Sequence, residues 1–220
     1  MADAIEGFEK VLELETGKTE WGFKALKRLC KLVLQKKQYS KVLAYWTKFL
    51  EYIKPGSSVS PNAAEKGVNT LLDLASAAGG GGSGAASETI TKMYELAVKA
   101  LTETKNQKML FIVNSKLAQA LYDTRQFERL EKVIGEMRRW CEVSPGVDDP
   151  KKGAQLVEVL ALEIQMRTTL GQTRALKDLC NRALAVTAIS KPKVLGVIRE
   201  CGGLMNMHEH EWLKARQDFF

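Results

Sequence analysis

The sequence has few of the residues from which active sites are usually built. Its two histidines, His208 and His210, stand two positions apart, whereas a metal-binding pair on a helix needs a spacing of three or four. It contains no Gly-x-Ser-x-Gly, His-Glu-x-x-His or Walker motif. Carboxylates such as Glu158 and Glu163 fall in amphipathic patterns, where solvated faces and ion pairs are usual. We therefore expect no catalytic residue, no metal site and no enzyme. A metal bound by His208 and His210 in an extended loop, and with it a standalone enzyme, is the alternative.

Paired cysteines, long apolar runs and a secretion signal are lacking as well. The four cysteines are widely spaced among apolar neighbours, which indicates buried free thiols in a reducing compartment; they are Cys30, Cys141, Cys180 and Cys201. No apolar run approaches the roughly 18 residues that span a bilayer, and the acidic N-terminus is unlike a signal peptide. These features predict a protein of the cytoplasm and nucleus with no membrane partner.

Positive charge, in contrast, is in excess. The chain has 33 Lys and Arg against 26 Asp and Glu, which gives a formal net charge of +7. Such a charge permits an anionic partner. The basic residues are dispersed among acidic ones and are not interleaved with stacking aromatics, so we expect no direct nucleic-acid binding. A basic helical-repeat protein that binds nucleic acid is kept as an alternative.

Apolar residues recur at helical spacing in nearly every part of the chain. The segments with this pattern are 20–36, 39–53, 108–122, 127–141 and 154–170. The alternation typical of strands is missing. Short breaks that contain Pro55, Pro145 and Pro192 separate the helical segments, because proline stops a helix or starts the next one.

Several helices are expected to open on a polar residue followed by an aromatic one. The aromatic anchors Tyr39, Phe127 and Trp212 lie 88 and 85 residues apart, and intermediate helices are expected to begin near Glu88 and Thr173. This spacing corresponds to helix pairs with a loose period of about 40 residues. The sequence therefore predicts an all-α fold, an α-solenoid of tetratricopeptide-like antiparallel helix pairs over residues 1–220. A compact helical bundle is the alternative.

Glycine is concentrated at two places. The stretch 75–87 has consecutive glycines, each of which costs about 1 kcal/mol in a helix, so it predicts a flexible Gly-rich loop, either native or engineered. Gly202-Gly203 is interpreted as a signal that ends a helix. The chain stops at Asp218-Phe219-Phe220 within a helical pattern, and we expect the array of repeats to continue beyond it.

The most concentrated basic segment follows Glu20. Lys24, Lys27, Arg28 and Lys31 are spaced by three and four residues, so they are expected to share one helix face. The face is either solvated or docks an acidic surface or a polyphosphate. Two further basic clusters are Arg129, Lys132, Arg138 and Arg139, and the pair Lys151 and Lys152.

Four strings resemble one family, that of subunit 2 of the COP9 signalosome. They are Trp21-Gly-Phe-Lys-Ala-Leu-Lys27, Asp149-Pro-Lys-Lys-Gly-Ala-Gln-Leu156, Leu162-Glu-Ile-Gln-Met166 and Gly196-Val-Ile-Arg-Glu-Cys-Gly-Gly203. The similarity runs in patches over nearly the whole chain and is weaker over residues 57–104. A proteasome lid subunit of the same architecture is the near alternative.

The resemblance implies a scaffold and substrate-docking role without catalysis. It implies a helical-repeat arm that precedes a PCI domain, which is absent from this chain. Its partners would be the other signalosome subunits and cullin–RING ubiquitin ligases, from whose cullin the complex removes a ubiquitin-like modifier (deneddylation). Inositol hexakisphosphate would act as an intermolecular glue on Lys18, Lys24 and Lys27, with Arg28 and Lys31 in the docking face; no other cofactor is expected.

Overall fold

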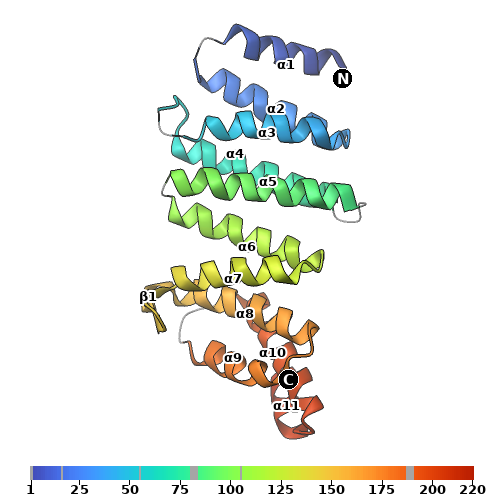
Figure 1. The fold of residues 1–220 in the computed structure, drawn as a ribbon, viewed down its shortest axis with the longest axis vertical. Coiled ribbons are helices and arrows are strands. Elements are labelled where there is room, and N and C mark those ends of the chain that lie inside the picture. Colours follow the sequence, from blue (N-terminus) through green and yellow to red (C-terminus); the bar gives the residue numbers. More distant parts are fainter. Residues whose placement is uncertain (1, 16, 55, 80–83, 105, 187–190) are drawn as a thin grey trace. The chain divides into compact units, whose positions relative to one another are not determined.

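The computed structural model describes residues 2–15, 17–54, 56–79, 84–104, 106–186 and 191–220 (Figure 1). Its contacts divide the chain into two units, residues 1–120 and residues 121–220, and each is considered by itself. Both units consist almost entirely of α-helices, which confirms the predicted all-α fold. None of the described helices has both the length and the apolar character needed to cross a membrane.

The first unit is a stack of helices joined in sequence order. It comprises α1 (Ala2–Leu14), α2 (Glu20–Gln35), α3 (Tyr39–Glu51), α4 (Pro61–Gly79), α5 (Gly84–Glu103) and most of α6 (Gln107–Asp123). Helix α2 contacts both α1 and α3, and α4 contacts α5 (Figure 1); in addition α2 packs on α4 and α3 packs on α5. Contacts between every second helix are typical of stacked antiparallel hairpins, so the predicted solenoid of helix pairs is confirmed within this unit.

Aromatic side chains fill the core of the first unit. The rings of Phe23 and Phe49 stack at 4.8 Å between centroids, and those of Trp46 and Phe49 at 5.4 Å. The indole N–H of the fully buried Trp46 donates to the carbonyl oxygen of Met93 at 2.9 Å, which satisfies its polar group inside the core. The core therefore joins α2 and α3 to α5.

The second unit begins with the last residues of α6. It continues with α7 (Phe127–Trp140), the strands β1 (Glu142–Ser144) and β2 (Val147–Asp148), the 3-10 helix η1 (Pro150–Lys152), α8 (Gly153–Thr169), α9 (Thr173–Ala185), α10 (Pro192–His208) and α11 (Trp212–Phe219). Here α8 contacts α7, α9 and α10, and α10 contacts α11. The antiparallel hairpin of β1 and β2 was not predicted; Gly146, with φ of 81°, allows its tight turn.

Four helix hairpins share one turn geometry. They join α2 to α3, α6 to α7, α8 to α9 and α10 to α11, and the residue with positive φ is Lys37, Arg125, Gly171 or His210, at 56° to 69°. The amide of the following residue donates to a carbonyl five residues earlier, as from Gln126 to Leu121 at 2.9 Å. The next helix then begins at once. Tyr39, Phe127, Thr173 and Trp212 are therefore the first residues of helices, as the repeat spacing predicted.

Both glycine-rich segments differ from expectation. Residues 75–79 and 84–87 of the predicted loop lie in α4 and α5, because alanines there favour helix and Ala75 and Ala86 are buried; residues 80–83 lie outside the described part. Gly202 and Gly203 do not end a helix. They lie inside α10, where a glycine lets α11 approach: a Cβ at position 203 would stand 2.6 Å from the ring of Phe219.

Candidate functional site

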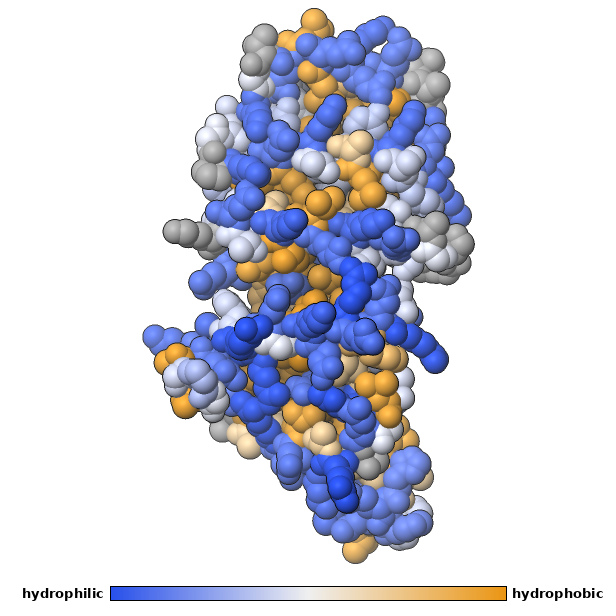
Figure 2. All heavy atoms as spheres, in the orientation of Figure 1, coloured by the Kyte–Doolittle hydropathy of each residue, from blue (hydrophilic) through white to orange (hydrophobic). Residues whose placement is uncertain are grey.

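Helix α2 carries the predicted basic residues on its solvent side. Thr19 caps the helix, accepting from the amide of Trp21 at 3.3 Å, and the opposite side buries residues such as Leu26, Leu29 and Val33. Lys24, Lys27, Arg28 and Lys31 fall on the remaining face, where Lys24 and Arg28 are exposed and the other two are half-buried. The shared face expected from the spacing is therefore present; its function stays a prediction. Figure 2 shows that hydrophilic side chains cover most of the visible surface between smaller hydrophobic patches.

Lys24 takes part in two weak surface interactions. Its ammonium pairs with Glu20 at 2.9 Å, one turn earlier in α2, and lies 5.4 Å from the ring centroid of Trp21. Both members of the pair are about 60% exposed, and such pairs contribute about 0.2–1 kcal/mol. A multiply charged anion can therefore compete with Glu20 for Lys24.

Lys18 lies just before α2 and is not on its face. Its side chain pairs with Glu51, at the end of α3, at 3.3 Å. Its backbone carbonyl accepts from the amide of Ser58 at 3.3 Å. Lys27, Arg28 and Lys31, in contrast, have no recorded ion-pair partner among the residues that the structure describes.

Trp21 is a surface residue that was not among the predicted site residues. Its side chain is 73% exposed, although Trp is usually found largely buried. Tryptophan is enriched among the residues that carry most of the binding energy at protein interfaces. The sequence signal was its place in the Trp-Gly-Phe-Lys string, one position outside the buried stripe of α2.

Glu15 holds the start of α2 in place and was also missed. Its carboxylate accepts from the amide of Thr19 at 2.7 Å and from the amide of Gly22 at 3.3 Å, as well as from the hydroxyls of Thr19 and Tyr52. Partial burial raises the pKa of this carboxyl, but the hydrogen bonds from Thr19 and Tyr52 outweigh it and lower the pKa below its usual 4.5. Glu15 therefore stays ionised at neutral pH and neutralises free amides at the N-terminus of α2.

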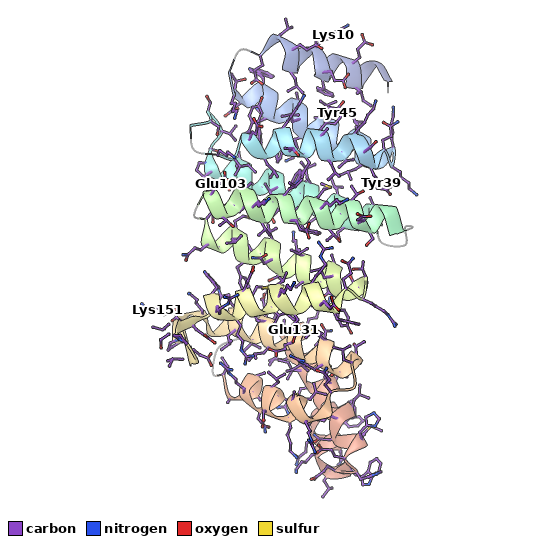
Figure 3. All side chains as sticks on the ribbon, viewed as in Figure 1. Lys10, Tyr39, Tyr45, Glu103, Glu131 and Lys151 are labelled. Carbon is purple, nitrogen blue, oxygen red and sulfur yellow. The ribbon has the colours of Figure 1, made fainter. Side chains whose placement is uncertain are left out.

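Each of the other two basic clusters has a side chain engaged in the fold of the second unit, whereas Lys132 and Lys151 are exposed (Lys151 is labelled in Figure 3). Arg138 pairs with the buried Glu163 at 3.1 Å. Lys152 donates to the carbonyl of Trp140 and lies 4.3 Å from the centroid of its ring. Arg138 thus holds α7 to α8, and Lys152 holds η1 to the end of α7, so these two are weaker candidates for docking than the face of α2.

The two histidines and four cysteines were considered in the sequence as metal ligands or nucleophiles, and the structure gives their surroundings. His208 ends α10 and the exposed His210 occupies the following turn, and the described residues include no group of three or more metal-ligand side chains. All four cysteines are buried, as predicted. Burial raises the pKa of Cys30 to about 12 and those of Cys141 and Cys180 to about 11, and it also raises that of Cys201, so all four remain thiols at neutral pH.

Comparison with solved structures supports the fold alone. The crystal structure of BtubC (BKLC) from P. vanneervenii matches 99% of this chain and 84% of that one with a TM-score of 0.57, at 15% sequence identity. No protein-family model matches the sequence.

Comparison with curated proteins is more specific. Proteins named COP9 signalosome complex subunit 2 are 44% identical in Dictyostelium discoideum, 40% in Caenorhabditis elegans and 39% in Drosophila melanogaster, each over 99% of this chain. The alignments cover 48%, 43% and 48% of those proteins, so the chain spans about half the length of the curated relatives it matches. The resemblance predicted from the sequence strings is thus confirmed: over nearly its whole length this chain is similar to part of the proteins named COP9 signalosome complex subunit 2.

Proposed function

We propose that this chain is the helical-repeat arm of a signalosome subunit and serves as a scaffold that docks cullin–RING ubiquitin ligases for removal of a ubiquitin-like modifier from the cullin. The observation that carries the proposal is the solvent-facing basic side of α2, with Lys24, Lys27, Arg28 and Lys31, in a chain whose relatives are named subunit 2 of the COP9 signalosome. Its other partners are the remaining signalosome subunits, in the cytoplasm and the nucleus.

A polyphosphate would join the arm to a basic surface of the ligase. Lys18, Lys24 and Lys27 are the residues that we assign to inositol hexakisphosphate, with Arg28 and Lys31 contributing to the positive field. The ion pairs of Lys18 with Glu51 and of Lys24 with Glu20 are both exposed to solvent. Phosphate groups carry more charge than these carboxylates, so they would replace them at little cost.

The role is non-catalytic. The raised pKa values of the buried thiols support this, because a cysteine nucleophile must reach its thiolate form and a site that water and substrate enter. Catalysis would be supplied by another subunit of the complex.

Isothermal titration of the purified chain with inositol hexakisphosphate, followed by capture of a purified cullin–RING ligase in its presence, tests the proposal. The double variant Lys24→Glu and Lys27→Glu should weaken both interactions by about tenfold or more, since it reverses charge within the docking face. The matched control is Lys99→Glu with Lys108→Glu, two exposed lysines of α5 and α6, and it should bind as the wild type does.

Two outcomes would contradict the assignment. Unchanged binding of both ligands by the α2 double variant would remove this face from the interface. Tight binding of RNA or DNA at physiological salt, with a steep decrease as salt is raised, would instead favour a nucleic-acid-binding protein.

A further inference from the structure

The carboxylate of Glu15 lies at the start of α2, but it bonds neither to Lys18 nor to the lysines of the basic face. Its recorded partners are neutral groups: the amide and hydroxyl of Thr19, the amide of Gly22 and the hydroxyl of Tyr52. The cations are paired elsewhere, Lys18 with a glutamate of α3 and Lys24 with one of α2. Glu15 therefore fixes the backbone that carries these cations and leaves their charge available.

Glu15 accepts hydrogen bonds from Thr19, two positions before Trp21, and from Gly22, directly after it. The Thr19 hydroxyl donates to Glu15 and accepts from the amide of Trp21 at 3.3 Å, while the amide of Gly22 donates to Glu15 directly. On the other side of the turn, the Thr19 amide donates to Glu15 and the Lys18 carbonyl accepts from Ser58, so the peptide group that joins Lys18 to Thr19 is held at both its N–H and its C=O. A single carboxylate thus sets the direction of both Lys18 and Trp21.

Gly22 is the residue that makes room for this carboxylate. A Cβ at position 22 would stand 1.8 Å from Oε2 of Glu15 and 2.5 Å from the hydroxyl of Tyr52. No real pair of atoms tolerates such a distance, so any larger residue at position 22 must expel Glu15 from its place. Gly22 lies in the first turn of α2 and is buried, and the substitution Gly22→Ala alters no charge.

We propose that Glu15 is a positioning residue of the anion-binding face: by fixing the turn before α2 it holds Lys18, Trp21 and Lys24 in the arrangement that a polyphosphate meets. This inference rests on the proposed function, because it concerns the same face. It predicts that removing a negative charge weakens the binding of an anion. Simple electrostatics predicts the reverse, since loss of a nearby carboxylate should strengthen the attraction.

Isothermal titration with inositol hexakisphosphate at one pH and salt concentration separates these cases. Glu15→Ala and Gly22→Ala should each weaken binding by about tenfold, because the pre-set arrangement of the cations is lost. The double variant should bind no more weakly than the worse single variant, since both remove the same contact. Glu15→Gln, which keeps an acceptor for the Thr19 amide, should restore most of the affinity.

Glu13→Ala is the matched control, because Glu13 is an exposed carboxylate at the end of α1 and its loss should leave the affinity unchanged or slightly raised. Should either alanine variant fail to fold by circular dichroism, Tyr52→Phe removes a single hydrogen bond to Glu15 and should weaken binding by a smaller factor.

The outcomes distinguish this inference from the function on which it rests. A wild-type chain that binds no inositol hexakisphosphate would overturn both. A wild-type chain that binds while Glu15→Ala or Gly22→Ala binds equally or more tightly would overturn only the positioning role. Additive losses in the double variant would show that the two residues act separately and would overturn it as well.

Discussion

The ring of Phe219 on α11 lies directly against the backbone of Gly203 on α10. A Cβ at position 203 would be 2.6 Å, 2.8 Å and 2.9 Å from three atoms of that ring. The preceding residue, Gly202, faces Asp218 in the same way, with 3.2 Å from its Cβ position to the carboxylate. With the Phe219 ring in this place, the contact between the two helices therefore leaves no room for a Cβ at position 203.

Gly203→Ala should destabilise the chain by about 1 kcal/mol, because the added methyl group displaces the half-exposed ring of Phe219 and weakens the contact between the two helices. Gly196→Ala is the control in the same helix. Nothing lies within 4 Å of its Cβ position, so there the change should stabilise by about 0.5–1 kcal/mol through helix propensity. Chemical denaturation followed by circular dichroism measures both. The same sign of change at positions 203 and 196 would contradict the packing described.

The pair Gly202-Gly203 also shows where sequence reasoning reached its limit. A glycine that ends a helix and a glycine that admits a neighbouring helix look alike in sequence, because the difference lies in a partner far along the chain. Helix bounds are local instead: periodicity and turn residues placed α2, α3, α6, α7 and α8 within a few residues of their observed ends. The hairpin of β1 and β2 was missed because its strands have only three and two residues.

Arg125→Gly should stabilise the second unit by about 0.5–1 kcal/mol. Arg125 has φ of 57°, a left-handed conformation that costs a residue with a Cβ about 1–2 kcal/mol, part of which glycine loses again through unfolded-chain entropy. Gly171 has the equivalent place in the turn from α8 to α9, with φ of 69°, so Gly171→Ala should destabilise by a similar amount. Arg125→Ala is the control for loss of the charge and should bring no gain. Melting temperatures that order these variants differently would show that the turns are not equivalent.

Part of the candidate site followed from the sequence and part did not. The basic face of α2 was visible because four cations at helical spacing need no knowledge of the rest of the fold. The roles of Glu15 and Gly22 were not visible, since they depend on Tyr52, which lies 37 positions beyond Glu15 and reaches it only after α2 and α3 have formed their hairpin. Polar contacts between distant segments carry no periodic signal.

Glu163→Ala should destabilise the second unit by about 2–3 kcal/mol. Glu163 is 8% exposed and lies 3.1 Å from Arg138 and 3.9 Å from Arg167, so its loss leaves two partly buried cations with weaker compensation. Glu131 lies 2.9 Å from Arg167 and still pairs with it in the variant, which reduces the loss of stability. Lys10→Ala, which breaks an exposed pair with Glu6, should cost less than about 0.5 kcal/mol. An equally small effect at Glu163 in denaturant titrations would mean that the buried pair is not formed.

Acid should weaken the attachment of the turn before α2. The pKa of Glu15 lies below its usual 4.5, which an unfolded chain would have, so the ionised carboxylate stabilises the folded state fully above about pH 4.5. That contribution is lost as the pH falls through the lower, folded pKa. In thermal unfolding between pH 7 and pH 3, the melting temperature of the wild type should therefore be higher than that of Glu15→Gln at neutral pH. The two melting temperatures should become equal in acid. Glu13→Gln, at an exposed carboxylate nearby, should follow the wild type throughout. A difference between wild type and Glu15→Gln that persists unchanged at pH 3 would mean that the carboxylate acts there by shape and not by charge.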